Sequence, residues 1–326
     1  MDNKKDQREI IMKKLIALLI CILLGLFFSG NSVSKNFSGK KVLFIDSYHE
    51  GYAWSDGITK GIQRGLRGSG ARLKIIRMNT KRNADTAFKK KAAQKAKKVI
   101  EQFRPDVVIA ADDNASKFMV KPYFRDADLP IVFCGVNWDA SVYGYPYSNV
   151  TGMVEVAPIP QLIEQMQLWA KGDRIGFLGP DILTAKKEAE NYEKIFGIKV
   201  KTYYAKDYSD WKSGFVKLQK EVDMLIIASD GGLYNDHAKE LEAFVRAKTR
   251  IPTGACYDFM IPYALVGVIK VAEEQGQWSA ATALKILDGK SPSEIPIVQN
   301  KRAKLVLNKK IGDAMGVDLS IFPNIR

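Results

Sequence analysis

Histidine and cysteine are scarce in this chain: its 326 residues include two histidines and three cysteines. No CxxC pair and no cysteine and histidine spacing typical of a metal site occurs. The GxSxG elbow, the phosphate-binding P-loop and the GxGxxG fingerprint are also missing. Asp112 and Asp113 are adjacent carboxylates, but neighbouring side chains point in different directions. We therefore expect no metal, no cofactor and no enzymatic activity.

The cysteines leave one question open. Cys134 and Cys256 each stand at the end of an apolar run. A disulfide between them is compatible with an exported protein, and two buried thiols that behave as small hydrophobic side chains explain the same positions.

Long hydrophobic runs are absent except near the start. Lys13 and Lys14 precede an apolar run from Leu15 to Phe28, which is followed by small polar residues up to Ser34. The run is short for a bilayer span, and the order of charged, apolar and small residues is typical of a signal peptide. We expect residues 1–34 to be removed and the protein to act in the periplasm or at the outer face of the cytoplasmic membrane. An uncleaved anchor is the alternative.

Acidic residues are fewer than basic ones, 36 against 50, which gives a net charge of +14. Much of the excess lies between residues 81 and 98, where the apolar positions have helical spacing and the lysines fall on the other side. Nucleic-acid binding would require aromatic residues among the cations or a recognisable module. The pattern predicts a solvated helix face that can also lie near anionic lipid, and no nucleic-acid partner.

β-Branched runs alternate with amphipathic stretches from Lys40 onward, a pattern typical of parallel sheets covered by helices. The predicted strands of the first half are Val42 to Asp46, Leu73 to Met78, Val107 to Ala110 and Ile131 to Gly135. After the turn-rich residues 143–146, a second series has strands at Arg174 to Leu178, Lys199 to Tyr204, Met224 to Ala228 and Ile251 to Ala255. Two doubly wound α/β lobes are therefore expected, completed by the remaining C-terminal elements.

A run of glycines marks the first predicted helix. Gly57, Gly61 and Gly65 recur every four residues and share one face, which could let the helix lie close to the sheet. Chance enrichment explains them equally well.

Several segments resemble a known family. KVLFIDSYHEGYAWSDGITKGI, LPIVFCGVNWDAS, SNVTGM, ALKILDGKSPSEIPI and LVLNKKIGDAMG are similar, in order and spacing, to ABC-transporter substrate-binding proteins of the type I periplasmic-binding fold. The branch includes tryptophan- and tyrosine-uptake proteins and sensory domains of some histidine kinases. The chain departs from many relatives where Asn137, Trp138 and Asp139 replace an Asp-Pro, so their ligand cannot be assumed here.

The resemblance implies two lobes joined by three crossovers, near Val150, Met260 and Ser291. Lobe 1 is then expected to comprise residues 40–150 and about 262–290, and lobe 2 residues 151–261 and about 291–326. It also implies a monomer that binds a small-molecule ligand by hinge closure and delivers it to an ABC transporter permease. A receptor that reports to a membrane histidine kinase is the alternative, which the end of the chain soon after Gly316 disfavours.

Ligands of open parallel sheets bind beyond the carboxyl ends of the strands. The candidate ligand-binding residues at these positions are Asp46, Ser47, Tyr48, Tyr52, Trp54, Asp112, Asp113, Asn114, Asn137, Trp138, Asp181, Tyr204, Ser229, Asp230, Tyr234, Tyr257 and Asp258. Aromatic faces and carboxylates suit an amino-acid-like or other amine-bearing, possibly aromatic, solute. Asp112, Asp113, Asp181 and Asp230 are equally suited to capping the helices that follow.

Overall fold

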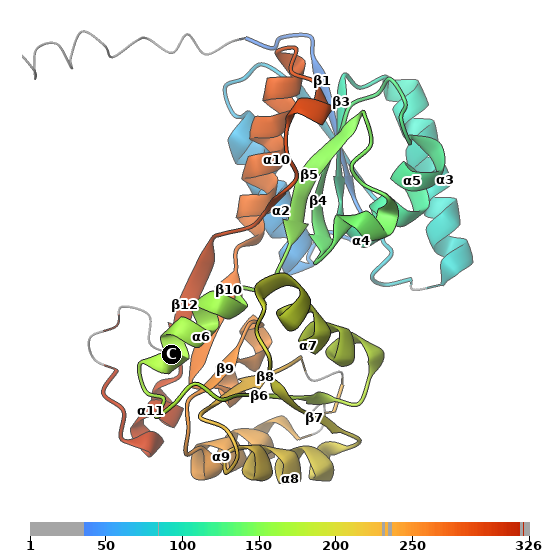
Figure 1. Ribbon diagram of the computed structural model, residues 1–326. Coiled ribbons are helices and arrows are strands. Elements are labelled where there is room, and N and C mark those ends of the chain that lie inside the picture. Colours follow the sequence, from blue (N-terminus) through green and yellow to red (C-terminus); the bar gives the residue numbers. More distant parts are fainter. Residues whose placement is uncertain (1–35, 84, 230–231, 234–236, 320–321, 323–326) are drawn as a thin grey trace, which may run out of the picture.

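The computed structural model describes residues 36–83, 85–229, 232–233, 237–319 and 322. They form two α/β lobes, one above the other in Figure 1, with a six-stranded sheet in each lobe. The predicted fold class, two doubly wound lobes, is confirmed.

The first sheet has the order β11-β5-β4-β3-β1-β2, and its strand pairs are all parallel. The strands are β1 (Lys41–Asp46), β2 (Arg72–Arg77), β3 (Val107–Ala111), β4 (Ile131–Asn137), β5 (Val150–Glu155) and β11 (Val298–Gln299). The core lies on both faces because successive side chains of β1 alternate: Phe44 joins one cluster, while Leu43 and Ile45 join the other.

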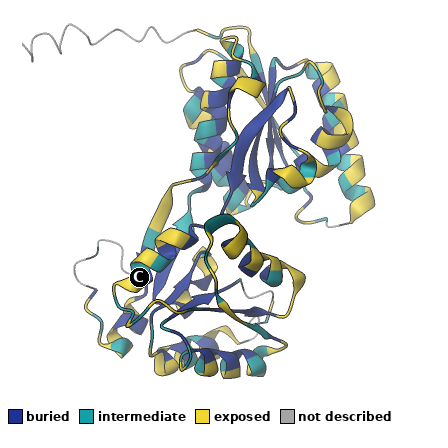
Figure 2. Cartoon of the chain, viewed as in Figure 1, coloured by how far each residue is buried: buried dark blue, intermediate teal, exposed yellow. Residues whose placement is uncertain are grey.

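Different helices cover the two faces of this sheet. α2 (Ala53–Leu66) and α10 (Ala272–Leu287) pack beside each other on one face (Figure 1). The other face is covered by α3 (Thr86–Phe103) and by the consecutive short helices α4 (Asp112–Ala115), η1 (Ser116–Val120) and α5 (Lys121–Tyr123), and the 3-10 helix η2 (Ala140–Tyr143) follows β4. The exposed sides of these helices face outward in Figure 2.

The second sheet has the order β12-β10-β9-β8-β6-β7, and only the β10 and β12 pair among these strands is antiparallel. Its strands are β6 (Ile175–Pro180), β7 (Lys201–Ala205), β8 (Met224–Ile227), β9 (Thr253–Ala255), β10 (Val266–Lys270) and β12 (Ala303–Leu307). The helices around it are α6 (Ile159–Gln167), α7 (Leu183–Phe196), α8 (Tyr208–Leu218), α9 (Ala238–Lys248) and α11 (Lys309–Met315), with the 3-10 helix η3 (Asp258–Tyr263) after β9. A further 3-10 helix, η4 (Pro292–Glu294), precedes β11 and contacts β5 of the first sheet.

The chain passes between the sheets three times, but later in the sequence than predicted. The passages are residues 156–158, residue 271 and residues 300–302, in place of Val150, Met260 and Ser291. The boundaries differ because β5 belongs to the first sheet and β10 to the second, whereas β11 returns to the first. Asn300 ties two passages together, since its amide accepts from Val156 N at 2.7 Å and donates to Val156 O at 3.2 Å.

The glycines of α2 pack against a helix, not against the sheet. A Cβ atom on Gly61 would lie 2.3 Å from the carbonyl oxygen of Glu273, and one on Gly276 would lie 2.1 Å from that of Ile58. Gly57 and Gly65 meet Ala272 and Ala280 of the same partner. These glycines therefore allow α2 and α10 to approach closely, and they join a late segment of the chain to the first lobe.

The two cysteines of the described chain do not form a disulfide. Cys134 lies in the first lobe and Cys256 in the second, and both are free and buried. The interpretation of both as buried thiols is therefore correct. Within the described ranges, every helix is too short or too polar to cross a bilayer.

Candidate functional site

A cleft of about 860 Å³ lies between the lobes. Its walls come from the first lobe at Lys81, Asp113, Asn137, Trp138 and Tyr143, and from the second lobe at Glu188, Asn191, Lys194, Ser229 and Tyr257, among others. The strands β3, β4, β8 and β9 end at or close to these residues. The cleft is thus formed where the carboxyl ends of both sheets face each other, as expected for open parallel sheets.

Asp112 is a buried carboxylate next to the cleft, directly after β3. It is 1% exposed, and its Oδ1 accepts a hydrogen bond from Trp54 Nε1 at 3.0 Å. Its Oδ2 has no hydrogen-bond partner among the described residues. Burial, with the negative charges of Glu155 and Asp46, raises the pKa of Asp112 well above its usual value. Asp112 has a φ of 67° and makes no cap, so the capping role is not observed.

Lys270 lies where the second passage leaves the second sheet, and it contacts both lobes. Its ammonium forms a hydrogen-bonded ion pair with Glu155 of β5. The same nitrogen lies 5.2 Å from the ring centroid of Trp54 and 5.7 Å from that of Tyr257. Charge pairing and cation–π attraction therefore hold one aromatic ring from each lobe around a single, partly buried cation.

Glu188 supplies a second buried acid from α7. Tyr192 donates to its Oε1 at 2.9 Å, and Tyr257 donates to its Oε2 at 3.4 Å. Burial raises the pKa of Glu188. This carboxyl group faces the cleft from the second lobe, opposite the acids of the first.

Asp113 faces the cleft and is held by its neighbours. Tyr143 donates to its Oδ1 at 2.8 Å, and Asn137 donates to its Oδ2 at 2.6 Å. The predicted pair Asp113 and Asn137 is therefore brought together by the adjacent strands β3 and β4, while Tyr143 was not predicted.

Trp138 connects the two lobes. It follows β4, and its ring lies 6.0 Å from that of Tyr192 and 6.5 Å from that of Phe196, both in α7. Beside it, Lys194 of α7 donates to Asp139 at 2.8 Å and lowers the pKa of Asp139 to about 2. Trp138 thus lines the cleft, as predicted, and also closes one side of it against the second lobe.

Tyr48 and Tyr52 form an edge-to-face pair, with ring centroids 5.3 Å apart, at the start of α2. Lys81 lies over both rings, 5.3 Å and 5.0 Å from their centroids, and itself lines the cleft. The two tyrosines are thus connected to the cleft through this lysine.

Three predicted residues stabilise the first lobe from within. Asp46 is fully buried, where it accepts from Ser55 at 2.8 Å and pairs with Arg77 at 3.4 Å. Ser47 donates to Ala111 O and accepts from Ala115 N, and Asn114 donates to Thr80. Their polar atoms are engaged by the turns after β1 and β3, so the structure does not place Asp46 or Ser47 in the wall of the cleft.

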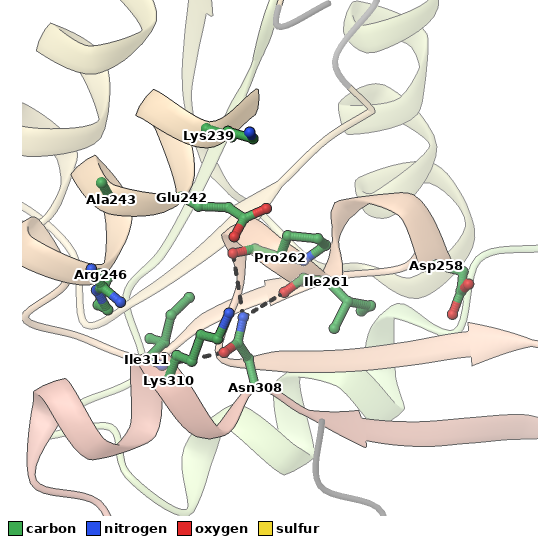
Figure 3. Close-up of a pocket in the computed structure, with 10 residues that line it drawn as sticks. All are labelled: Lys239, Glu242, Ala243, Arg246, Asp258, Ile261, Pro262, Asn308, Lys310 and Ile311. Atoms are coloured by element: carbon green, nitrogen blue, oxygen red, sulfur yellow. Dashed lines mark hydrogen bonds between the residues drawn. The ribbon is translucent and has the colours of Figure 1, made fainter. Parts of the chain in front are cut away.

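The predicted ligand-binding residues of the second lobe lie in different places. Asp181 is exposed and forms an ion pair with Lys186 at 2.5 Å, while Tyr204 packs against Phe177. Asp258 lines a different pocket, between α9, η3 and α11 (Figure 3). Ser229 and Tyr257 line the cleft. Asp230 and Tyr234 lie outside the described residues.

Residues that were not predicted complete the site: Lys81, Tyr143, Glu155, Glu188 and Lys270. Glu155 belongs to a strand that was not predicted, and Lys270 is the last residue of β10. A charged residue at the end of a buried strand is the signal that could have identified both. No group of three or more potential metal ligands occurs among the described residues.

Known structures share this architecture. A ligand-free, open structure of a substrate binding protein with adhesive properties from Clostridium difficile is 19% identical and has a TM-score of 0.70, covering 88% of this chain and 98% of that one. A Streptococcus ABC domain in complex with L-Trp is 18% identical and has a TM-score of 0.56, covering 89% of this chain and 100% of that one. A periplasmic ribose ABC transporter protein from Conexibacter woesei is 14% identical, with a TM-score of 0.56 and coverage of 87% and 97%.

These likenesses show the type I periplasmic binding fold. No curated protein matches the chain. Residues 50–320 match the family described as ABC transporter substrate binding protein, which is non-enzymatic. The expectation of no enzymatic activity is thereby confirmed, and the chain belongs to the family of ABC transporter substrate binding proteins.

Proposed function

We propose that this substrate-binding protein carries an amine-bearing solute with an apolar, amino-acid-sized body. The observation that supports it is the cleft, where Asp113 and Glu188 approach from opposite lobes beside the rings of Trp138, Tyr143 and Tyr257. Carboxylates neutralise an ammonium group, and aromatic faces cover an apolar body. The L-Trp bound to the Streptococcus structure is a ligand of this chemical kind.

A thermal-shift screen of amino acids and their deaminated analogues tests the ligand class. A ligand that binds only the native state stabilises it by about 2.7 kcal/mol at 100 times Kd. We expect the Tm to rise with amines and to stay unchanged with the matching carboxylic acids. Equal shifts with both series would contradict the role of the acidic residues.

The transport cycle rests on closure of the cleft. A ligand that contacts both lobes binds the closed form better, so it shifts the population toward that form. The three passages restrict the movement to a hinge. Small-angle scattering of the purified protein should then show a smaller radius of gyration with saturating ligand. An unchanged scattering curve would place the ligand on one lobe.

Export is part of the same proposal, because substrate-binding proteins of this family usually act outside the cytoplasm. Lys13, Lys14 and the apolar run after them are typical of a signal peptide. Mass spectrometry of protein from the producing host should find a new N-terminus between Gly30 and Asn36. Intact Met1 on soluble cytoplasmic protein would contradict export.

Trp54→Ala is expected to weaken binding of the identified ligand by about 1–3 kcal/mol. Trp54 is held by Asp112 and Lys270 next to the cleft, so its loss removes an aromatic surface and releases both charges. Calorimetry measures the effect, and Trp169→Ala is the control, since Trp169 packs against Phe322 of the second lobe. Equal affinities of the Trp54 variant and the wild type would exclude Trp54 from the binding surface.

A further inference from the structure

A second concave surface lies on the first lobe alone. It is a groove of about 820 Å³ between α3 and the end of β2, and it shares no lining residue with the interlobe cleft. Its apolar part includes Ile76 from β2 and Phe88, Ala92 and Val99 from α3. The groove is therefore independent of the site where the solute is proposed to bind.

Lysines of α3 line this groove. Lys91, Lys95 and Lys98 are exposed, and none forms an ion pair within the described part of the chain. The acidic residue of α3, Glu101, is already bonded to Lys97. The groove thus combines apolar side chains with uncompensated positive charge, which suits an anionic partner that also has apolar side chains.

The strand beside the groove is an edge. β2 is the last strand in the order of the first sheet. The N–H groups of Arg72 and Met78 point toward β1, where they bond to Lys40 O and Asp46 O. By the alternation of a strand, the backbone groups of Leu73, Ile75 and Arg77 point away from the sheet. An extended segment can hydrogen-bond to such groups.

The spacing of the lysines fits an extended chain. Four residues of α-helix advance about 6 Å, and three advance about 4.5 Å. Alternate residues on one side of a strand are about 6.6 Å apart. Lys91, Lys95 and Lys98 can therefore meet acidic side chains at alternate positions, while the intervening side chains point to the opposite face of the sheet.

We propose that this groove binds an extended, acidic segment of a partner polypeptide by adding it to the edge of β2. Positive side chains alone also protect an edge from self-association, but that protection does not require the apolar side chains that line the groove. A flat anionic membrane would contact the convex lysines of α3 as readily as those in the groove. The concave shape and the free strand edge favour the peptide.

The test uses a fluorescent peptide of about ten residues with alternating Glu and Val, which matches the spacing argument. Fluorescence anisotropy with purified wild-type protein should show binding, whereas an alternating Lys and Val peptide should not bind. Hydrogen exchange with the Glu and Val peptide should become slower at the amides of Leu73, Ile75 and Arg77.

Two charge-reversal variants of equal net charge locate the site. Lys91→Glu with Lys95→Glu changes the groove, and Lys89→Glu with Lys90→Glu changes the same helix outside it. We expect the first to weaken peptide binding about tenfold and the second less than about threefold, because close charge pairs contribute most. Equal losses in both variants, no peptide binding to the wild type, or binding only to phosphatidylglycerol vesicles would overturn the proposal. Matching melting curves would show that both variants are folded.

Discussion

Replacing Lys270 with methionine is expected to lower the free energy of unfolding by about 3–5 kcal/mol. The variant leaves Glu155, whose side chain is 8% exposed, buried without its cation. It also removes the charge that Trp54 and Tyr257 share across the lobes. Urea denaturation at neutral pH measures the loss.

The double variant Lys270→Met with Glu155→Gln is the matched control. Because it removes both charges, it should recover much of the lost stability. Equal stabilities of the single and double variants would show that the ion pair is not the cause. Burial alone would lower the pKa of Lys270, but the charge of Glu155 outweighs it and the pKa is raised above 10.5. The contribution of Lys270 is therefore complete below about pH 10.5 and is lost as the pH rises through the raised pKa.

Asp112→Asn is expected to have effects of opposite sign on stability and on binding. In the ligand-free protein at neutral pH it should raise the free energy of unfolding by about 1–3 kcal/mol, because it removes a carboxyl group whose charged form is disfavoured by burial and keeps an acceptor for Trp54. Binding of an amine-bearing ligand should weaken about tenfold, because the variant lacks the carboxyl group whose charged form a nearby ammonium group favours. Gain of stability with loss of function is common at binding sites.

The pH dependence follows from the raised pKa of Asp112. The folded wild type retains this proton above pH 3.8, where the unfolded chain releases it, so wild-type stability falls as the pH rises from there to the raised pKa. The advantage of Asp112→Asn should therefore be largest at neutral pH and should vanish as the pH falls toward 4. Asp128→Asn is the control, because Asp128 is exposed and does not line the cleft. A constant difference at every pH would exclude titration of Asp112 as the cause.

The fold could be predicted from the sequence because most strands are short β-branched runs between amphipathic helices. β5 was not predicted: its residues, VTGMVE, combine glycine, methionine and glutamate, and their burial depends on neighbours from both ends of the chain. For the same reason, the predicted lobe boundaries lie earlier in the sequence than the observed ones. Periodicity marks that β10 and α10 exist, but not which sheet each one joins.

The candidate site was predicted less completely. Of the residues selected by their position after a strand, five line the cleft: Asp113, Asn137, Trp138, Ser229 and Tyr257. Their role in ligand binding stays a prediction. The same rule selected Asp46 and Ser47, whose polar atoms instead stabilise turns, because sequence position does not distinguish a buried cap from an exposed ligand contact. Lys270 and Glu155 meet across 115 positions of the sequence, a pairing that only the three-dimensional structure reveals.

The packing of α10 against α2 determines when the first lobe can mature. α10 ends at Leu287, so synthesis from the N-terminus must reach this residue before the first lobe gains the helix. Until then the glycine face of α2 and the adjacent side of the sheet lack their cover. Nascent chains that end before α10 therefore leave this surface accessible to proteases and chaperones. A truncation before α10 is expected to prevent the folding of both lobes, not of one.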